Sequence, residues 1–206
     1  MSIDNAKPRI GFQNTILGGN FLLLAILGMI ASSPAERVAI PRICVTALHI
    51  TIALLFLVRR PSSRIANWKE LAICFPSFIL AAFAWKLAHD SDSWSTATQI
   101  MLLSGTLFTI YSLAYLGNSF AIFPAQREIK VQGPYRLVRH PVYLGELIMI
   151  LACCISTGRL LAVAVFLAAV VSVAIRLIAE ERFLIASEDY QQYRLKVRWR
   201  LLPILW

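Results

Sequence analysis

Long apolar runs constrain this chain more than any other feature of its sequence. A membrane-spanning helix needs about 20 mostly apolar residues. Turn-forming residues such as Ser32-Ser33-Pro34 and Gly158 separate the runs. The runs lie at 10–31, 41–58, 69–88, 97–117, 141–157 and 159–178. The sequence therefore predicts an all-α, polytopic integral membrane bundle of four N-terminal spans followed by a C-terminal helical hairpin, and it leaves open whether that hairpin spans the membrane fully.

Composition supports a bilayer as the main solvent. The chain is 58% hydrophobic and 15% charged, whereas soluble domains are typically about half apolar and about a quarter charged. A net charge of +9 would suggest nucleic-acid binding in a soluble chain, but here Lys and Arg lie between apolar runs, where they set topology and meet anionic lipid headgroups. We expect membrane lipids as partners and no nucleic acid.

The distribution of basic residues predicts the orientation. Arg37, Arg42, Lys86 and Arg159 fall on one side of the expected bundle, and the other 16 of the 20 Lys and Arg residues fall on the opposite side. The positive-inside rule then places both termini and the 118–140 loop in the cytoplasm. The first run is longer than the apolar core of a cleaved signal peptide, so we expect a retained helix.

The four cysteines lie inside apolar runs, without the spacing of a metal site. We expect Cys44, Cys74, Cys153 and Cys154 to pack as small core residues, and we expect no metal. Charge and turn residues concentrate after residue 117. We therefore divide the chain into a transmembrane scaffold, 1–117, and a more polar C-terminal region, 118–206.

The segment around His140 is the most informative part of the sequence. Gly133-Pro134 predicts a turn, and Pro141 suits the first turn of a helix. His140 then lies at a helix N-terminus, where backbone N–H groups favour an anion. Tyr143 and Glu146 follow at three-residue steps and should share its face. The alternative is an interfacial belt that only anchors the membrane boundary.

A polar stripe marks the end of the last apolar run. Ser172, Arg176 and Glu180 recur every four residues, and Glu181 adjoins them. The alternative is an ordinary salt bridge with Arg176 snorkelling to the headgroups, but ionisable groups at such depth usually face a cavity or a partner. Beyond it, Ser187 predicts a further helix N-terminus, and the basic tail with its two tryptophans predicts an interfacial segment.

Four segments together resemble the isoprenylcysteine carboxyl methyltransferase family of membrane enzymes, which use S-adenosylmethionine. They are GPYRLVRHPVYLGE (133–146), RLIAEERFL (176–184), EDYQQY (188–193) and VRWRLLP (197–203). The resemblance covers about residues 115–206 and implies that the C-terminal region, 118–206, is the catalytic region. It implies methyl transfer to a lipophilic acceptor, a small molecule or lipidated substrate, most simply at the carboxylate of an isoprenylcysteine-like lipid.

The resemblance also implies roles for individual residues. Arg176 would contact the substrate and Glu180 the cofactor, and these two would be the catalytic pair. The implied cofactor-binding residues are Arg127, Glu128, Ile129, Lys130, Tyr135, His140, Pro141, Val142, Tyr143 and Glu180; at 127–130 only backbone contacts are expected, because the side chains differ from the family's.

Alternatives remain at this stage. A membrane reductase of the sterol-reductase type shares the RHPxY-like segment and would use NADPH, and a non-enzymatic membrane protein would bind neither cofactor. The acceptor atom is also open, because an amine or thiol would need a base from Glu180, Glu181 or His140. Oligomeric state does not follow from the sequence.

Overall fold

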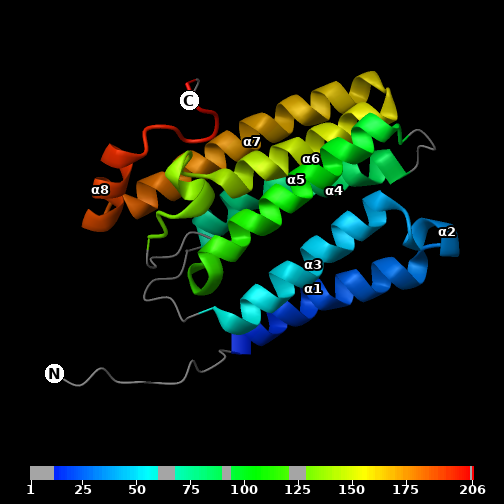
Figure 1. Cartoon of the computed structure of the whole chain (residues 1–206), viewed down its shortest axis with the longest axis horizontal. Helices are drawn as coiled ribbons and strands as arrows, with labels where there is room; N and C mark the ends of the chain where they lie inside the picture. The colour runs from blue at the N-terminus through cyan, green and yellow to red at the C-terminus, as the bar shows by residue number, and fades with distance from the viewer. Residues whose placement is uncertain (1–11, 60–67, 90–93, 121–128, 205) are drawn as a thin grey trace.

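The computed structural model describes residues 12–59, 68–89, 94–120, 129–204 and 206, and for residues 12, 13 and 68–71 the backbone alone. Helices account for most of this part of the chain (Figure 1). The α-helices are α1 (Phe12–Ala31), α2 (Pro34–Arg37), α3 (Ile40–Val58), α4 (Trp68–His89), α5 (Thr96–Leu116), α6 (Pro141–Thr157), α7 (Leu160–Leu184) and α8 (Glu188–Lys196). Two 3₁₀ turns, η1 (Gly117–Ser119) and η2 (Gly133–Arg136), flank the loop between α5 and α6.

Five of these helices, α1, α3, α4, α5 and α7, are long and apolar enough to cross a membrane, and α6 is a shorter apolar helix of 17 residues. Large apolar side chains lie exposed along them, among them Leu54, Ile79, Leu107 and Leu167. Such surfaces suit lipid and would be costly in water. The prediction of an all-α polytopic membrane bundle is therefore confirmed.

The helices run side by side, and different elements lie at the two ends of the bundle. Figure 1 shows α8, the ends of α5 and α7 and the start of α6 together at one end, which we call the α8 end; α2 and the α6–α7 turn lie at the other. Helix α1 packs against α3, α3 against α5, α5 against α6, and α4 against both α6 and α7. Helix α4 thus joins the region that the sequence assigns to catalysis.

Two glycines allow the close packing of α6 against α5 and the tight turn between α6 and α7. A Cβ atom on Gly145 would lie 2.1 Å from Thr109 Oγ1, so α5 and α6 approach too closely for a larger residue there. Gly158 has a φ of +62° at the C-cap of α6, and one further residue, Arg159, separates it from α7. The predicted hairpin of α6 and α7 is therefore confirmed.

The predicted spans agree with the helices to within a few residues, with one informative exception. Helix α7 continues to Leu184, six residues past the predicted end at 178. Glu180 and Glu181 extend it because their carboxylates bind protein partners at the α8 end rather than entering lipid. The short α2 was not predicted; Ser33 and Glu36 form a capping box at its start.

The C-terminal tail folds back onto the start of α6. The backbone N–H groups of Arg139 and His140 donate to the carbonyls of Trp199 and Arg200, each at 2.9 Å. Trp206 packs against a buried cluster that includes Tyr143 and Leu177. The tail therefore fixes the residues just before α6, which carry the most informative motif of the sequence.

Candidate active site

Two groups of charged and aromatic side chains meet where α6 begins and α7 ends. The first, the Arg176 cluster, contains Ser77, Phe78, Tyr143, Glu146 and Arg176. The guanidinium Nη1 of Arg176 donates to Ser77 Oγ at 3.2 Å and lies 3.5 Å from Glu146 Oε2. The guanidinium carbon Cζ also lies over two aromatic rings, 4.5 Å from the centroid of Phe78 and 4.7 Å from that of Tyr143. Arg176 is 5% exposed, so this is a buried cation held by aromatic and acidic partners.

Glu180 lies one helical turn beyond Arg176 and connects it to His140. Tyr143 donates its hydroxyl to Glu180 Oε2 at 2.5 Å, and His140 Nδ1 is 4.0 Å from the same oxygen. The rings of His140 and Tyr143 stack at 5.5 Å with an interplanar angle of 8°. Glu180 retains 27% of its side-chain exposure, so its carboxylate remains accessible to a ligand.

The second group, the Glu181 cluster, contains Arg139, His140, Glu181, Tyr190 and Arg200. Arg139 Nε, Tyr190 Oη and His140 Nε2 lie 2.8, 3.1 and 3.3 Å from Glu181 Oε1. Arg200 Nε donates to the other oxygen at 2.9 Å. Arg139 also donates to the carbonyls of residues 197 and 198. Glu181, 8% exposed, therefore ties the start of α6, α8 and the tail together.

Tyr135 presents a buried hydroxyl at the same end of the bundle. The residue is 5% exposed, and its hydroxyl has no hydrogen-bond partner among the residues that the structure describes. Burial raises the pKa of Tyr135 well above its ordinary value, and the nearby Glu180 and Tyr193 raise it further. Because buried polar groups are normally paired, this phenol is suited to a ligand.

The turn that carries Tyr135 depends on Gly133. Its φ is +58°, and a Cβ atom there would lie 2.6 Å from the Tyr115 ring. The Tyr135 carbonyl accepts a hydrogen bond from Tyr193 at 2.7 Å. Tyr193 and Tyr190 are both buried, and burial is the first cause that raises the pKa of each phenol. The turn is thus clamped between α5 and α8.

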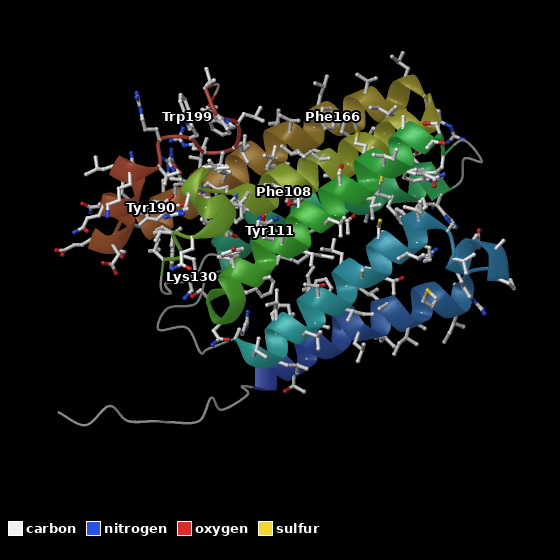
Figure 2. All side chains as sticks on the ribbon, viewed as in Figure 1. Phe108, Tyr111, Lys130, Phe166, Tyr190 and Trp199 are labelled. Atoms are coloured by element: carbon white, nitrogen blue, oxygen red, sulfur yellow. The ribbon has the colours of Figure 1, made fainter. Side chains whose placement is uncertain are left out.

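The structure brings most of the predicted site residues to the α8 end. Pro141 is fully buried at the first position of α6. Val142 is partly buried and packs against a core that includes Phe56 and Leu113. Ile129 packs against the Tyr135 cluster, and Figure 2 shows Lys130 at this end together with Tyr190 and Trp199. Arg127 and Glu128 lie outside the described residues. The binding roles of all these residues remain predictions.

Sequence reasoning missed several partners. Ser77 and Phe78 come from α4, where the only local signal was a polar residue beside Pro76 in an apolar run. Arg139 adjoins His140 in the motif, yet it binds Glu181, 42 residues away. Arg200 had been assigned to an interfacial tail. Figure 2 shows the charged side chains gathered around α8 and the tail, whereas the long helices carry mostly apolar ones.

The fold and the site define a helical membrane protein with a buried polar site at one end of the bundle. Residues 94–192 match the family model of phospholipid methyltransferases. The matched segment runs from just before α5 into α8, and its family also holds the isoprenylcysteine carboxyl methyltransferase-like enzymes, so the resemblance is confirmed at this level. A comparison with curated proteins gives no match. Helix α4, with Ser77 and Phe78, precedes the matched segment.

Proposed function

We propose that this protein transfers a methyl group from S-adenosylmethionine to a lipophilic acceptor, with a carboxylate as the favoured acceptor group. The observation that carries the proposal is one continuous path of contacts. It runs from Glu180, which is partly accessible at the α8 end and lies beside the buried His140, through Tyr143 to the buried Arg176. A site for a polar methyl donor thus adjoins a site for an anionic group among apolar helices.

Glu180 and Tyr135 are the groups best suited to bind the methyl donor. Glu180 is accessible and can accept from the ammonium of the donor's amino-acid part. The Tyr135 hydroxyl, which has no partner within the described part of the chain, supplies a polar contact, and the stacked rings of His140 and Tyr143 supply aromatic surface beside it. These residues fit a ligand that is both cationic and aromatic. S-adenosylmethionine would supply a methyl group on a sulfonium, open to in-line displacement.

The acceptor side is argued from Arg176. A carboxylate is already a nucleophile and needs no general base, so the main requirement is positioning about 3–3.5 Å from the methyl group. Arg176 can hold such a carboxylate through charge-assisted hydrogen bonds. An apolar groove of about 480 Å³ lies between α4 and α7, lined by Pro76 and Ser172 among others. Two of its lining residues, Pro76 and Ile175, directly precede Ser77 and Arg176 in the sequence, which supports entry of an apolar chain from the lipid.

The cytoplasm is the proposed location of the α8 end and of both termini. Arg136, Arg182 and the basic residues of α8 and the tail lie at this end. Arg37, Arg42 and Arg159 belong to the opposite end, near α2 and the α6–α7 turn (Figure 1). The positive-inside rule favours this orientation, which gives a water-soluble methyl donor direct access to Glu180.

An amine acceptor is the second candidate, and one observation favours it. Glu146 already lies beside Arg176, so the buried cation is partly neutralised and attracts an acidic lipid less. An amine would need a base. Glu181 does not suit that role because both its oxygens already accept from protein donors. Glu180 or His140 would then accept the proton.

Ligand-induced stabilisation tests the reaction class. A ligand that binds only the folded state raises the free energy of unfolding by about 2.7 kcal/mol at 100 times its Kd. We expect S-adenosylhomocysteine to raise the melting temperature of the full chain in detergent, and NADPH to leave it unchanged. The reverse result would support a reductase. No shift with either would support a non-enzymatic protein.

The acceptor role of Arg176 needs a separate experiment. We expect Arg176→Ala to keep its stabilisation by S-adenosylhomocysteine and to lose methyl transfer to acidic lipids by at least about a hundredfold, because a buried charge partner contributes on the order of 3 kcal/mol. Arg159→Ala, at the opposite end, is the control. An Arg176→Ala protein with normal transfer would refute the assignment.

A further inference from the structure

Glu146, the acidic partner of Arg176, has no role in the proposed methyl transfer to a carboxylate. Glu146 lies on α6, six residues after His140, and its Oε2 is 3.5 Å from Arg176 Nη1. Its side chain is 14% exposed, against 6% for that of Arg176. A buried cation needs a counter-ion when no ligand is present. Glu146 meets that need in the structure.

The pair is held loosely compared with the other buried pair nearby. Arg139 Nε lies 2.8 Å from Glu181 Oε1, the length of a charge-assisted hydrogen bond. The distance from Arg176 Nη1 to Glu146 Oε2 is 3.5 Å, beyond the usual range for such a bond. Ser77, at 3.2 Å, is the closer partner of that nitrogen. A lipid carboxylate that reached Arg176 with better geometry would therefore have a weak competitor.

The backbone of Glu146 is fixed, which leaves its side chain as the part that can move. Gly145 packs against Thr109 and the Gly105 carbonyl so closely that α6 cannot shift toward α5. The greater exposure of Glu146 makes it, rather than Arg176, the member of the pair that can turn away. Arg176 is retained by Phe78, Tyr143 and Ser77.

We propose that Glu146 is a specificity-determining residue: it is the resident counter-ion of Arg176, and the carboxylate of an acidic lipid acceptor displaces it. This inference rests on the proposed function. Glu146 opposes acidic acceptors by repulsion and by competition for the same guanidinium. It thereby admits only those carboxylates whose apolar chain contributes enough binding in the groove between α4 and α7.

Glu146→Gln tests the inference in the full-length protein. We expect this variant to lower KM for an N-acylated S-prenylcysteine, which carries one carboxylate, by roughly tenfold, the scale of removing one close like charge. The kcat should stay within about twofold, and the affinity for S-adenosylhomocysteine should not change. Glu188→Gln, which removes an exposed carboxylate on α8, is the matched control and should leave KM unchanged.

The outcomes separate this inference from the proposed function. An unchanged or raised KM for the acid in Glu146→Gln overturns the inference while methyl transfer itself stands. A wild-type protein that binds S-adenosylhomocysteine but never methylates the acid overturns the inference and the choice of acceptor together. A wild-type protein that fails to bind S-adenosylhomocysteine overturns the proposed function.

A second variant, Glu146→Asp, keeps the test possible if Glu146→Gln does not fold. If Glu146→Gln is not stabilised by S-adenosylhomocysteine, Glu146→Asp replaces it, because it keeps the charge and withdraws it by one methylene group. We expect the same direction, a lower KM for the acid with kcat retained. A KM equal to or above the wild-type value in that variant counts against the inference in the same way.

Discussion

Glu180 and Glu181 are neighbours in the sequence, yet they belong to different parts of the molecule. The helix turns about 100° between them, so Glu180 faces Tyr143 and the Arg176 cluster while Glu181 faces Arg139, Tyr190 and Arg200. Glu181 is 8% exposed and accepts from three side chains besides His140. Glu180 is 27% exposed. One carboxylate is saturated and the other is available.

The two carboxylates divide the site into a part that the protein itself fills and a part that is open to a ligand. A carboxylate offers about four lone-pair positions, and at Glu181 protein donors fill them. Those donors come from the start of α6, from α8 and from the tail, so the bond network assembles the site. We expect Glu181 to act in stability and Glu180 in ligand binding, although both are acidic, adjacent and within reach of His140.

Glu181→Gln should have the largest effect. It removes the negative charge beside the buried Arg139 and leaves that cation without its closest acid, a change that typically costs about 3–5 kcal/mol. We expect a marked fall in the melting temperature of the ligand-free protein in detergent. Glu188→Gln removes an exposed charge from the same end and should change it little. A stable Glu181→Gln protein that has lost only cofactor binding would show that Glu181, rather than stabilising the fold, binds the ligand.

Glu180→Gln should leave the ligand-free melting temperature almost unchanged and weaken S-adenosylhomocysteine binding. A hydrogen bond to a charged group contributes about 1.5–3 kcal/mol, which corresponds to roughly a ten- to hundredfold rise in Kd. Isothermal titration in detergent measures it. An unchanged Kd would show that Glu180 does not contact the ligand.

Local sequence patterns predicted the helices well because the signals that start, continue and end a helix lie within the helix or next to it. Apolar runs, Gly158 and Pro141 fixed the spans, the hairpin turn and the start of α6 without knowledge of any distant contact. The four-residue step from Arg176 to Glu180 also identified one face of α7 correctly. The end of α7 was placed too early because its polar last turn resembles a loop until its partners are known.

The partners themselves lay beyond such reasoning. Ser77 and Arg176 are 99 residues apart, and Arg139 and Glu181 are 42 apart. No periodicity relates residues on separate helices, so α4 was assigned only to the scaffold. The sequence therefore located Glu180 and Glu181, but it could not predict which of the two carboxylates would accept its hydrogen bonds from protein donors.

Two tyrosines provide a matched pair of smaller changes. Tyr143→Phe removes the hydroxyl that donates to Glu180 and keeps the ring beside His140; Tyr190→Phe removes a hydroxyl that donates to Glu181. Each change should cost about 1–2 kcal/mol. We expect the first to raise the Kd of S-adenosylhomocysteine several-fold and the second to lower the melting temperature instead. Equal effects on both measurements would remove the distinction between the two acids.

Ser77→Ala should have the smallest effect and tests whether the division extends to α4. The change removes one hydrogen bond to Arg176, a contribution of about 1 kcal/mol, and leaves the Phe78 and Tyr143 rings in place. We expect KM for an acidic lipid to rise about fivefold while the Kd of S-adenosylhomocysteine stays constant, because Ser77 touches the acceptor side alone. Ser104→Ala, which removes an exposed hydroxyl on α5, is the control. A change in cofactor affinity with KM unaltered would mean that α4 supports the donor side, and that the groove between α4 and α7 does not lead to the reacting carboxylate.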